Sequence, residues 1–247
     1  MLRATLFDFY GTLAEVPREG GYQTINNWLE IVRTAGKEIT LKEGARIGTQ
    51  LWEDYSLGRM QSDREYVEKF LDIVGIAKSE DIINKLLETW VARRLFVVYP
   101  ETISVIAEIK KIGLKIGVIS DSPVPWFKNH IIQAGIEKLV DATVVSGEIG
   151  SKKPNPQIYM KVLEKLQLEP LETVFISDAP SDLLGAHKVG IERLVLISPS
   201  SKPYRVGEQA KDSFKEKFME LEELKIKPIV VKNLGETLNV IKGFLKP

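Results

Sequence analysis

Side chains that can carry out chemistry stand at four places where an apolar run of the sequence gives way to polar residues. They are Asp8 with Thr12, Ser120 with Asp121, Lys153, and Asp178 with Asp182. Brought together, carboxylates, hydroxyl groups and an ammonium group suit attack by a carboxylate nucleophile on an electrophile that bears negative charge. Taken singly, each is equally a residue that ends a strand or caps a turn. Their recurrence at successive strand ends predicts a single site.

Asp8 is the candidate nucleophile. It directly follows the apolar pair Leu6 and Phe7, and Gly11 gives the backbone freedom to turn away soon afterwards. Ligands of open α/β sheets bind at the carboxyl ends of the strands, which is where this pattern places the carboxylate. The stretch on its own also fits an aspartate that only caps a turn. The later strand ends therefore favour the nucleophile.

Lys153 supplies the positive charge that such a nucleophile needs. Two like unit charges about 4 Å apart repel by on the order of 4 kcal/mol at an effective dielectric constant near 20, and a fixed ammonium group removes much of that cost. A metal ion held by Asp8 and Asp178 would act in the same direction, since oxygen ligands suit magnesium. The alternative for Lys153 is a solvated lysine in a turn, which is our interpretation of its neighbour Lys152.

The elements that must position these side chains alternate between helix and strand from residue 96 onward. Strands are predicted at 114–119, 142–145, 173–176, 193–197 and 229–231, and helices at 101–112, 125–134, 157–166, 181–189 and 234–245. This alternation predicts an α/β fold with a Rossmann-like parallel sheet and helices on both faces. Residues 1–14 supply its first strand, so 1–14 and 96–247 are assigned to one catalytic core. The polar segment 198–225 is interpreted as a surface excursion with a helix.

Residues 15–95 show a different pattern. From about residue 22 to residue 95 strand-like alternation is absent, and apolar residues recur at helical spacing, as in Ile25, Leu29 and Val32. Aromatic side chains anchor the segment: Trp28, Trp52, Tyr55, Tyr66, Phe70 and Trp90. We predict a small all-helical domain inserted between the first strand and the rest of the core.

Composition narrows the possible partners. The 247 residues include 34 Lys and Arg against 34 Asp and Glu, so neither nucleic acid nor a membrane surface is expected as a partner. Without cysteine, and with only two histidines, any metal would be held by oxygen. No signal-peptide pattern or long apolar stretch is present in the sequence, so we expect a cytoplasmic protein. The Lys, Glu and Ile usage is compatible with a thermophilic source.

Four motifs in this order resemble those of the haloacid dehalogenase (HAD) superfamily. The matching stretches are Asp8 to Leu13, Ile119 to Asp121, Lys153 to Pro156, and Ser177 to Asp182 followed by Gly185 and Ala186. The resemblance implies that Asp8 forms a covalent ester or acyl phosphate. It further implies that Thr12 and Ser120 bind oxygen atoms and that Lys153 offsets negative charge. The helical insert is similar to the mobile cap of the superfamily.

Tyr10 distinguishes two subfamilies. Phosphatases of the superfamily usually carry a second aspartate at this position, and loss of a general acid costs about 10²–10⁴ in rate. A halide leaves without a proton, and the motif with Tyr10 resembles that of the 2-haloacid dehalogenases. By that resemblance Asp8 displaces the halide and Asp182 orients or activates water. Tyr159, six residues after Lys153, matches a tyrosine of those enzymes, and with Tyr10, Asp121 and Ser177 it is assigned to substrate binding.

Three residues bear on this assignment. The dehalogenases have asparagine where this chain has Asp121, a carboxylate that would be unfavourable beside a leaving anion. Arg46 lies near the place of a cap arginine that binds substrate, although a solvated charge on a helix surface is the alternative. Asp178 is the acid that phosphatases use to hold magnesium, and the backbone carbonyl of Tyr10 would complete such a site with Asp8.

The leading expectation is a 2-haloacid dehalogenase type of hydrolase that acts on a small anionic substrate without a cofactor. The first alternative is a phosphatase of the same fold that uses magnesium bound by Asp8, Tyr10 and Asp178. The second alternative is a metabolite-binding relative that has lost turnover. We expect a monomer or a homodimer.

Overall fold

Six parallel strands form the central sheet. The computed structural model describes residues 1–15, 17–91, 95–198 and 208–246. The strand order is β5-β4-β1-β6-β7-β8, with strands at β1 (Ala4–Asp8), β4 (Lys115–Ser120), β5 (Ala142–Val145), β6 (Thr173–Ser177), β7 (Arg193–Ile197) and β8 (Ile229–Val231). The predicted α/β fold with a parallel sheet is confirmed.

Strand β1 occupies the middle of the sheet. Phe7 is in register with Val118 on β4 and with Ile176 on β6, both in parallel. All five residues of β1 are buried, because a strand with neighbours on both sides and helices on both faces has no solvent-exposed surface. Asp8 is therefore delivered to the carboxyl edge by a fully buried strand.

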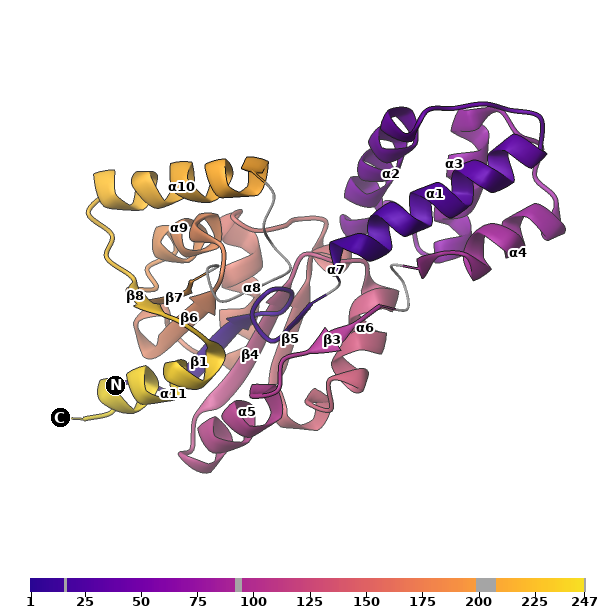
Figure 1. Ribbon diagram of the computed structural model, residues 1–247. Coiled ribbons are helices and arrows are strands. Elements are labelled where there is room, and N and C mark those ends of the chain that lie inside the picture. The colour runs from indigo at the N-terminus through magenta and orange to yellow at the C-terminus, as the bar shows by residue number, and fades with distance from the viewer. Residues whose placement is uncertain (16, 92–94, 199–207, 247) are drawn as a thin grey trace.

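Helices cover both faces of the sheet (Figure 1). Helices α5 (Thr102–Lys111), α6 (Val124–Gln133) and α11 (Leu234–Phe244) pack with Phe7 and Val118 on one face. The other face, with Leu6 and Phe175, is covered by α8 (Pro156–Leu166), α9 (Pro180–Lys188) and α10 (Glu208–Glu223). Because Leu6 and Phe7 point to opposite faces, the alternation along β1 supplies both cores.

The segment interpreted as a surface excursion contains α10, as expected for its helix. Residues 199–207 of that segment lie outside the described part of the chain. Leu221 is fully buried in the same apolar cluster as Leu184 of α9. The end of α10 is therefore part of the core, which corrects the interpretation of the segment as surface only.

Four helices form a separate lobe beside the sheet (Figure 1): α1 (Arg18–Thr34), α2 (Leu41–Ser56), α3 (Asp63–Val74) and α4 (Glu80–Glu88). Thr40, Ser62 and Ser79 cap the N-termini of α2, α3 and α4, each accepting a backbone N–H three residues on. The lobe has its own apolar cluster, in which the ring centroids of Trp28 and Phe70 are 4.9 Å apart. We call these four helices the cap.

Short elements join and supplement the cap and the sheet. β2 (Ala14–Glu15) and β3 (Val97–Val98) pair antiparallel where the chain leaves the core and returns to it. A single turn, α7 (Ser146–Ile149), follows β5, and 3₁₀ turns cover Glu137–Leu139 and Pro170–Glu172. These short elements were not predicted from the sequence, because so few residues show no periodicity and none of them is a long apolar run.

Among the helices that the structure describes, none combines the length and the apolar character needed to cross a membrane.

Candidate active site

Lys153 joins two acids of the site. Its Nζ atom forms an ion pair with Oδ1 of Asp8 and, at 2.9 Å, with Oδ2 of Asp182. Asp8 ends β1, Lys153 lies in the segment between α7 and α8, and Asp182 lies in the first turn of α9. All three are buried. The structure thus brings together the three residues predicted to be catalytic.

The charge on Lys153 is held in place by its neighbours. Burial alone would lower the pKa of Lys153, but the carboxylates of Asp182, Asp8 and Asp121 together raise it well above its ordinary value. Burial raises the pKa of Asp182, and the ammonium group of Lys153 opposes that shift. A buried cation between two acids is stable only as a paired group. Lys153 is therefore no solvated turn lysine.

Thr12 forms a hydrogen bond with the second carboxylate oxygen of Asp8. The hydroxyl of Thr12 donates to Oδ2 of Asp8 at 3.2 Å. The loop that carries it turns sharply, with Leu13 N donating to Phe9 O at 2.9 Å and Gly11 at a φ of 92°. An L-residue with a side chain rarely adopts such a φ, which explains the glycine in this position. Both carboxylate oxygens of Asp8 are thus fixed in direction.

Asp182 is held from two further sides. Ser177 donates to Oδ2 of Asp182 at 2.9 Å, and the N–H of Ala179 donates to Ser177 Oγ at 3.1 Å. Tyr159, from α8, donates its hydroxyl to the backbone carbonyl of Asp182 at 2.8 Å. Burial raises the pKa of Tyr159, so the hydroxyl stays neutral and remains a donor. This contact fixes the start of α9, while the predicted substrate role of Tyr159 stays a prediction.

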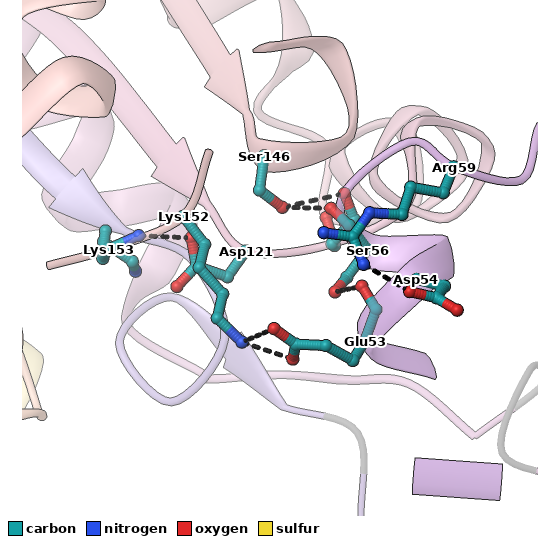
Figure 2. Close-up of polar contacts among 9 residues, drawn as sticks. Glu53, Asp54, Ser56, Arg59, Asp121, Ser146, Lys152 and Lys153 are labelled. Atoms are coloured by element: carbon teal, nitrogen blue, oxygen red, sulfur yellow. Dashed lines mark hydrogen bonds and ion pairs between the residues drawn. The ribbon is translucent and has the colours of Figure 1, made fainter. Parts of the chain in front are cut away.

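Asp121 approaches the site from the end of β4. Its Oδ1 accepts the backbone N–H of Lys153 at 3.0 Å, as Figure 2 shows. Burial, together with the charges of Asp182 and Asp8, raises the pKa of Asp121 to about 6, although Lys153 lowers it. Near and below this pH a large fraction of Asp121 is neutral, so it can carry an O–H donor. Protonation weakens the objection that a carboxylate here would repel a leaving anion.

Tyr10 forms a hydrogen bond with His130, a residue that sequence patterns did not indicate as part of the site. Its hydroxyl lies 2.8 Å from Nδ1 of His130, which α6 carries into the core with 1% of its surface exposed. Burial raises the pKa of Tyr10 and the charge of Asp8 adds to the shift, against a side-chain hydrogen bond with Ser122. The phenol therefore stays neutral. Nothing in the periodicity of α6 indicates which of its polar residues faces Tyr10.

Arg46 is not joined to this cluster. It lies on the exposed face of α2, where its charge acts on Glu43 at the start of the helix. Within the described ranges, no hydrogen bond or ion pair connects Arg46 with Asp8, Lys153 or Ser120. Its assignment to substrate binding stays a prediction.

Other cap residues reach the core at the end of α2 (Figure 2). Glu53 forms an ion pair with Lys152, the residue that precedes Lys153, and Ser146 of α7 donates to the carbonyl of Ser56 at 2.5 Å. Farther along, Trp126 of α6 donates its indole N–H to Asp63 at 2.8 Å. The cap is thus docked on the two segments, α7 and α6, that flank the carboxyl edge of the sheet.

The ends of β1 and β6 carry oxygen donors of the kind that magnesium prefers. Asp178 directly follows β6 and is 3% exposed, and Asp8 ends the neighbouring β1. Over the ranges that the structure describes, no group of three acids or histidines could hold a metal by itself. Magnesium commonly uses only one or two carboxylates and keeps several waters. Asp8 and Asp178 therefore suit magnesium in the kind of donor that they offer, and the predicted site that adds the carbonyl of Tyr10 stays a prediction.

Comparison with known proteins identifies two kinds of relative. The model of the haloacid dehalogenase-like hydrolase family matches residues 2–190. The chain is 24% identical to the glyceraldehyde 3-phosphate phosphatase of Methanocaldococcus jannaschii over 100% of both proteins. It is 23% identical to (S)-2-haloacid dehalogenase 1 of Pseudomonas sp. strain CBS-3, over 82% of this chain and 87% of that protein.

Solved structures show the same fold. The 2-haloacid dehalogenase of Pseudomonas syringae pv. Tomato DC3000 superposes with a TM-score of 0.69 at 18% identity, over 99% of this chain and 100% of that one. At this identity the likeness concerns the fold. The choice between dehalogenase and phosphatase chemistry must come from the site itself.

Proposed function

Because the chain belongs to the haloacid dehalogenase-like hydrolases, we propose that it releases halide from a small 2-halo acid through a covalent ester on Asp8. The observation that carries this proposal is the state of Tyr10. Two residues after the nucleophile stands a neutral, partly buried phenol bonded to His130, in place of a carboxylic acid that could protonate an alcohol. A halide needs no such proton.

The proposed reaction has two steps. A carboxylate oxygen of Asp8 attacks C2 of the substrate, and the carbon–halogen bond breaks with its electron pair leaving on the halide. Water, giving a proton to Asp182, then adds to the carbonyl carbon of the Asp8 ester. Collapse of the adduct breaks the bond to the substrate oxygen, which takes the proton back. The product is a 2-hydroxy acid, and the released acid form of Asp8 loses one proton to solvent.

Supporting groups match these steps. Lys153 offsets the charge of both the nucleophile and the substrate carboxylate, which would otherwise repel each other. Asp182 is buried with a raised pKa, which suits a group that must take a proton from water. Ser177 and Lys153 keep its oxygen in place before the water arrives.

The covalent route can be tested by following oxygen atoms from water into Asp8. Enzyme in excess over 2-chloropropionate, in water enriched in oxygen-18 and without added metal, should release chloride and place the label in Asp8, because water attacks the carbonyl of the ester. Mass spectrometry of the peptide that contains Asp8 detects it. Asp8→Asn should release no chloride. Label found in the product of the first turnover, with none in Asp8, would contradict the covalent route.

One observation favours a second candidate, a phosphatase that depends on magnesium. Asp178 keeps a buried carboxyl group beside Asp8, and a relative aligned over its full length is named as a phosphatase. Asp8, Asp178 and the carbonyl of Tyr10 would hold the ion, which would neutralise charge on a phosphoryl group. Phosphate release from small phosphate esters that requires magnesium, with no chloride release from 2-chloropropionate, would favour this candidate over the first.

A further inference from the structure

The C-terminal end of α2 in the cap lies along the core segment that leads to Lys153 (Figure 2). At the start of this segment, Ser146 of α7 donates to the carbonyl of Ser56 at 2.5 Å. Farther along, Glu53 of α2 forms an ion pair with Lys152 through both of its carboxylate oxygens. The cap therefore contacts the segment both where it begins and directly before Lys153.

The core holds the same segment at two nearby points. The N–H of Gly147 donates to the carbonyl of Ser122 at 3.3 Å, and the N–H of Lys153 donates to Oδ1 of Asp121 at 3.0 Å. Asp121 and Ser122 directly follow β4, so both anchors belong to one loop of the core. Between the anchors the backbone turns at Gly150, with a φ of 68°. Cap and core thus share the task of placing this short segment.

The placement of the backbone matters because the ammonium group of Lys153 must reach two acids at once. It pairs with Asp8 and with Asp182, and the side chain of Lys153 is only 4% exposed. A buried ammonium group that moves away from its carboxylates keeps the cost of desolvation and loses the compensating attraction. A small displacement at Lys152 would therefore weaken the charge compensation at the nucleophile.

We propose that Glu53 is a positioning residue that, through Lys152, keeps the backbone of Lys153 where its ammonium group contacts Asp8 and Asp182. The docking of the cap and the charge compensation at the nucleophile are then coupled. The proposal rests on the proposed function only in giving Lys153 a part in the reaction. Glu53 acts through its neighbour and needs no contact with the substrate.

The exposure of the ion pair limits the size of the expected effect. The side chains of Lys152 and Glu53 are 41% and 46% exposed, so water and salt screen their attraction. Loss of an exposed ion pair changes an equilibrium by up to about fivefold. We therefore expect changes of about threefold to fivefold, measured at low ionic strength.

Hydrogen exchange at the backbone amide of Lys153 tests the coupling without any substrate. The amide is protected by its hydrogen bond to Asp121, and its exchange under native conditions reports opening of the segment. Nuclear magnetic resonance of protein labelled with nitrogen-15 in lysine follows the signal, which Lys153→Arg assigns. Glu53→Gln should speed this exchange about threefold to fivefold. No change in the exchange rate would overturn the proposal.

Asp54→Asn is the matched control on the cap. Asp54 is the next residue of α2, and it pairs with Arg59, which follows the same helix, at 2.5 Å (Figure 2). The side chains of this pair are also partly exposed, so the variant removes an ion pair of the same kind without touching the pair that joins cap and core. Exchange at Lys153 should not change. Acceleration equal to that of Glu53→Gln would overturn the positioning role.

A second lysine amide separates local opening from a loss of overall stability. The N–H of Lys115 donates to the carbonyl of Arg3 at 2.9 Å at the start of the sheet. Its exchange reports opening of the core and should be the same in Glu53→Gln as in the parent. Equal acceleration of the Lys115 and Lys153 amides would overturn the proposal, because the ion pair would then only stabilise the whole fold.

Kinetics with 2-chloropropionate test the consequence for catalysis. Glu53→Gln and Lys152→Gln should each lower kcat/KM about threefold to fivefold, and the double variant should show no further loss, because both changes break the same pair. If Lys152 instead attracts the anionic substrate, removing its partner should raise kcat/KM and removing Lys152 should lower it. Such opposite signs, or an unchanged kcat/KM in Glu53→Gln, would overturn the positioning role.

The two measurements keep this proposal distinct from the proposed function. Absence of chloride release by the unmodified protein would overturn the proposed function, while hydrogen exchange at Lys153 would still decide whether Glu53 positions the segment. Chloride release by the unmodified protein, together with unchanged exchange in Glu53→Gln, would overturn the positioning role alone.

Discussion

At the scale of single residues, Asp121 links the site to the stability of the fold. Its pKa is about 6 in the folded protein against an ordinary value of 3.8, with burial as the main cause. The folded state then binds the proton more tightly than the unfolded state, so the stability contributed by this group falls as the pH rises from about 4 through 6. A carboxyl group that lowers stability at neutral pH is consistent with a role in the site.

Asp121→Asn should therefore stabilise the protein at pH 7.5. We expect a gain of about 1–2 kcal/mol, taken from about 1.4 kcal/mol per pKa unit and reduced for solvent screening of a side chain that is only partly enclosed. The amide oxygen can still accept the N–H of Lys153. Urea unfolding at pH 7.5 and pH 4 measures the gain, which should vanish at pH 4. An equal gain at both values would show that charge is not the cause.

Tyr10→Asp should increase phosphatase activity if the missing acid is what limits it. General acids contribute about 10²–10⁴ in rate, so we expect an increase of about tenfold or more in phosphate release with magnesium. Tyr10→Asn is the matched control, because it loses the contact with His130 in the same way but supplies no acid. Equal rates in the two variants would mean that the shape of the site excludes phosphate esters.

Residues at strand ends could be predicted from sequence, and their partners on helices could not. Asp8, Lys153 and Asp182 come together because parallel strands share one carboxyl edge. His130 escaped attention, since its part depends on how far α6 is rotated against the sheet, and this rotation is set by packing such as the stack of Phe96 on the imidazole. The predicted substrate roles of Arg46 and Tyr159 remain to be tested by mutation.

At the scale of elements, the end of α2 and α7 bring the backbones of cap and core into close contact. Gly58, just after α2, has a φ of 75°, and a Cβ atom there would lie 2.2 Å from the carbonyl oxygen of Gly147 in α7. The hydrogen bond from Ser146 to Ser56 lies beside it. Two glycines without side chains thus let the cap rest on the turn that leads to Lys153.

Gly58→Ala should disturb this contact. A left-handed conformation costs a residue with a Cβ about 1–2 kcal/mol, and the clash with Gly147 adds about 1–3 kcal/mol. Gly36→Ala is the control, since Gly36 has nearly the same φ of 77° and nothing within 4 Å of the added atom. Chemical unfolding should show the larger loss for Gly58→Ala. Similar losses of stability in both variants would mean that the cap shifts away from Gly147 without a measurable cost in free energy.

The fold could be predicted wherever an element was long enough to repeat its pattern. The strand Arg193–Ile197 was predicted with the bounds that the structure shows, and α6 was predicted within one residue at each end. Ala14 and Glu15 pair with Val98 and Val97, a ribbon of two residues on each side that has no local signature. It joins segments that lie on either side of the cap in the sequence, so its formation is a tertiary effect.

At the scale of the whole molecule, binding at the edge between cap and core should raise global stability. A ligand that binds only the folded state stabilises it by about 2.7 kcal/mol at 100 times its dissociation constant. For a chain of this length that corresponds to a rise of about 5–10 °C in the melting temperature. Asp8→Asn with 2-chloropropionate tests this without turnover, and propionate, which lacks the halogen, serves as the control. If saturating 2-chloropropionate left the melting temperature unchanged, the folded protein would have no specific site for it.

The central position of β1 also has a consequence during synthesis. Phe7 pairs with Ile176, 169 positions later in the chain, and a ribosome that adds 5–20 residues per second needs about 8–34 s to cover that distance. The first strand must wait for this time without its second neighbour. The cap residues that form most of the helical cluster, from Trp28 to Trp90, are complete well before then. Nascent chains should therefore form cap structure first and enclose Asp8 only after β6 has been made.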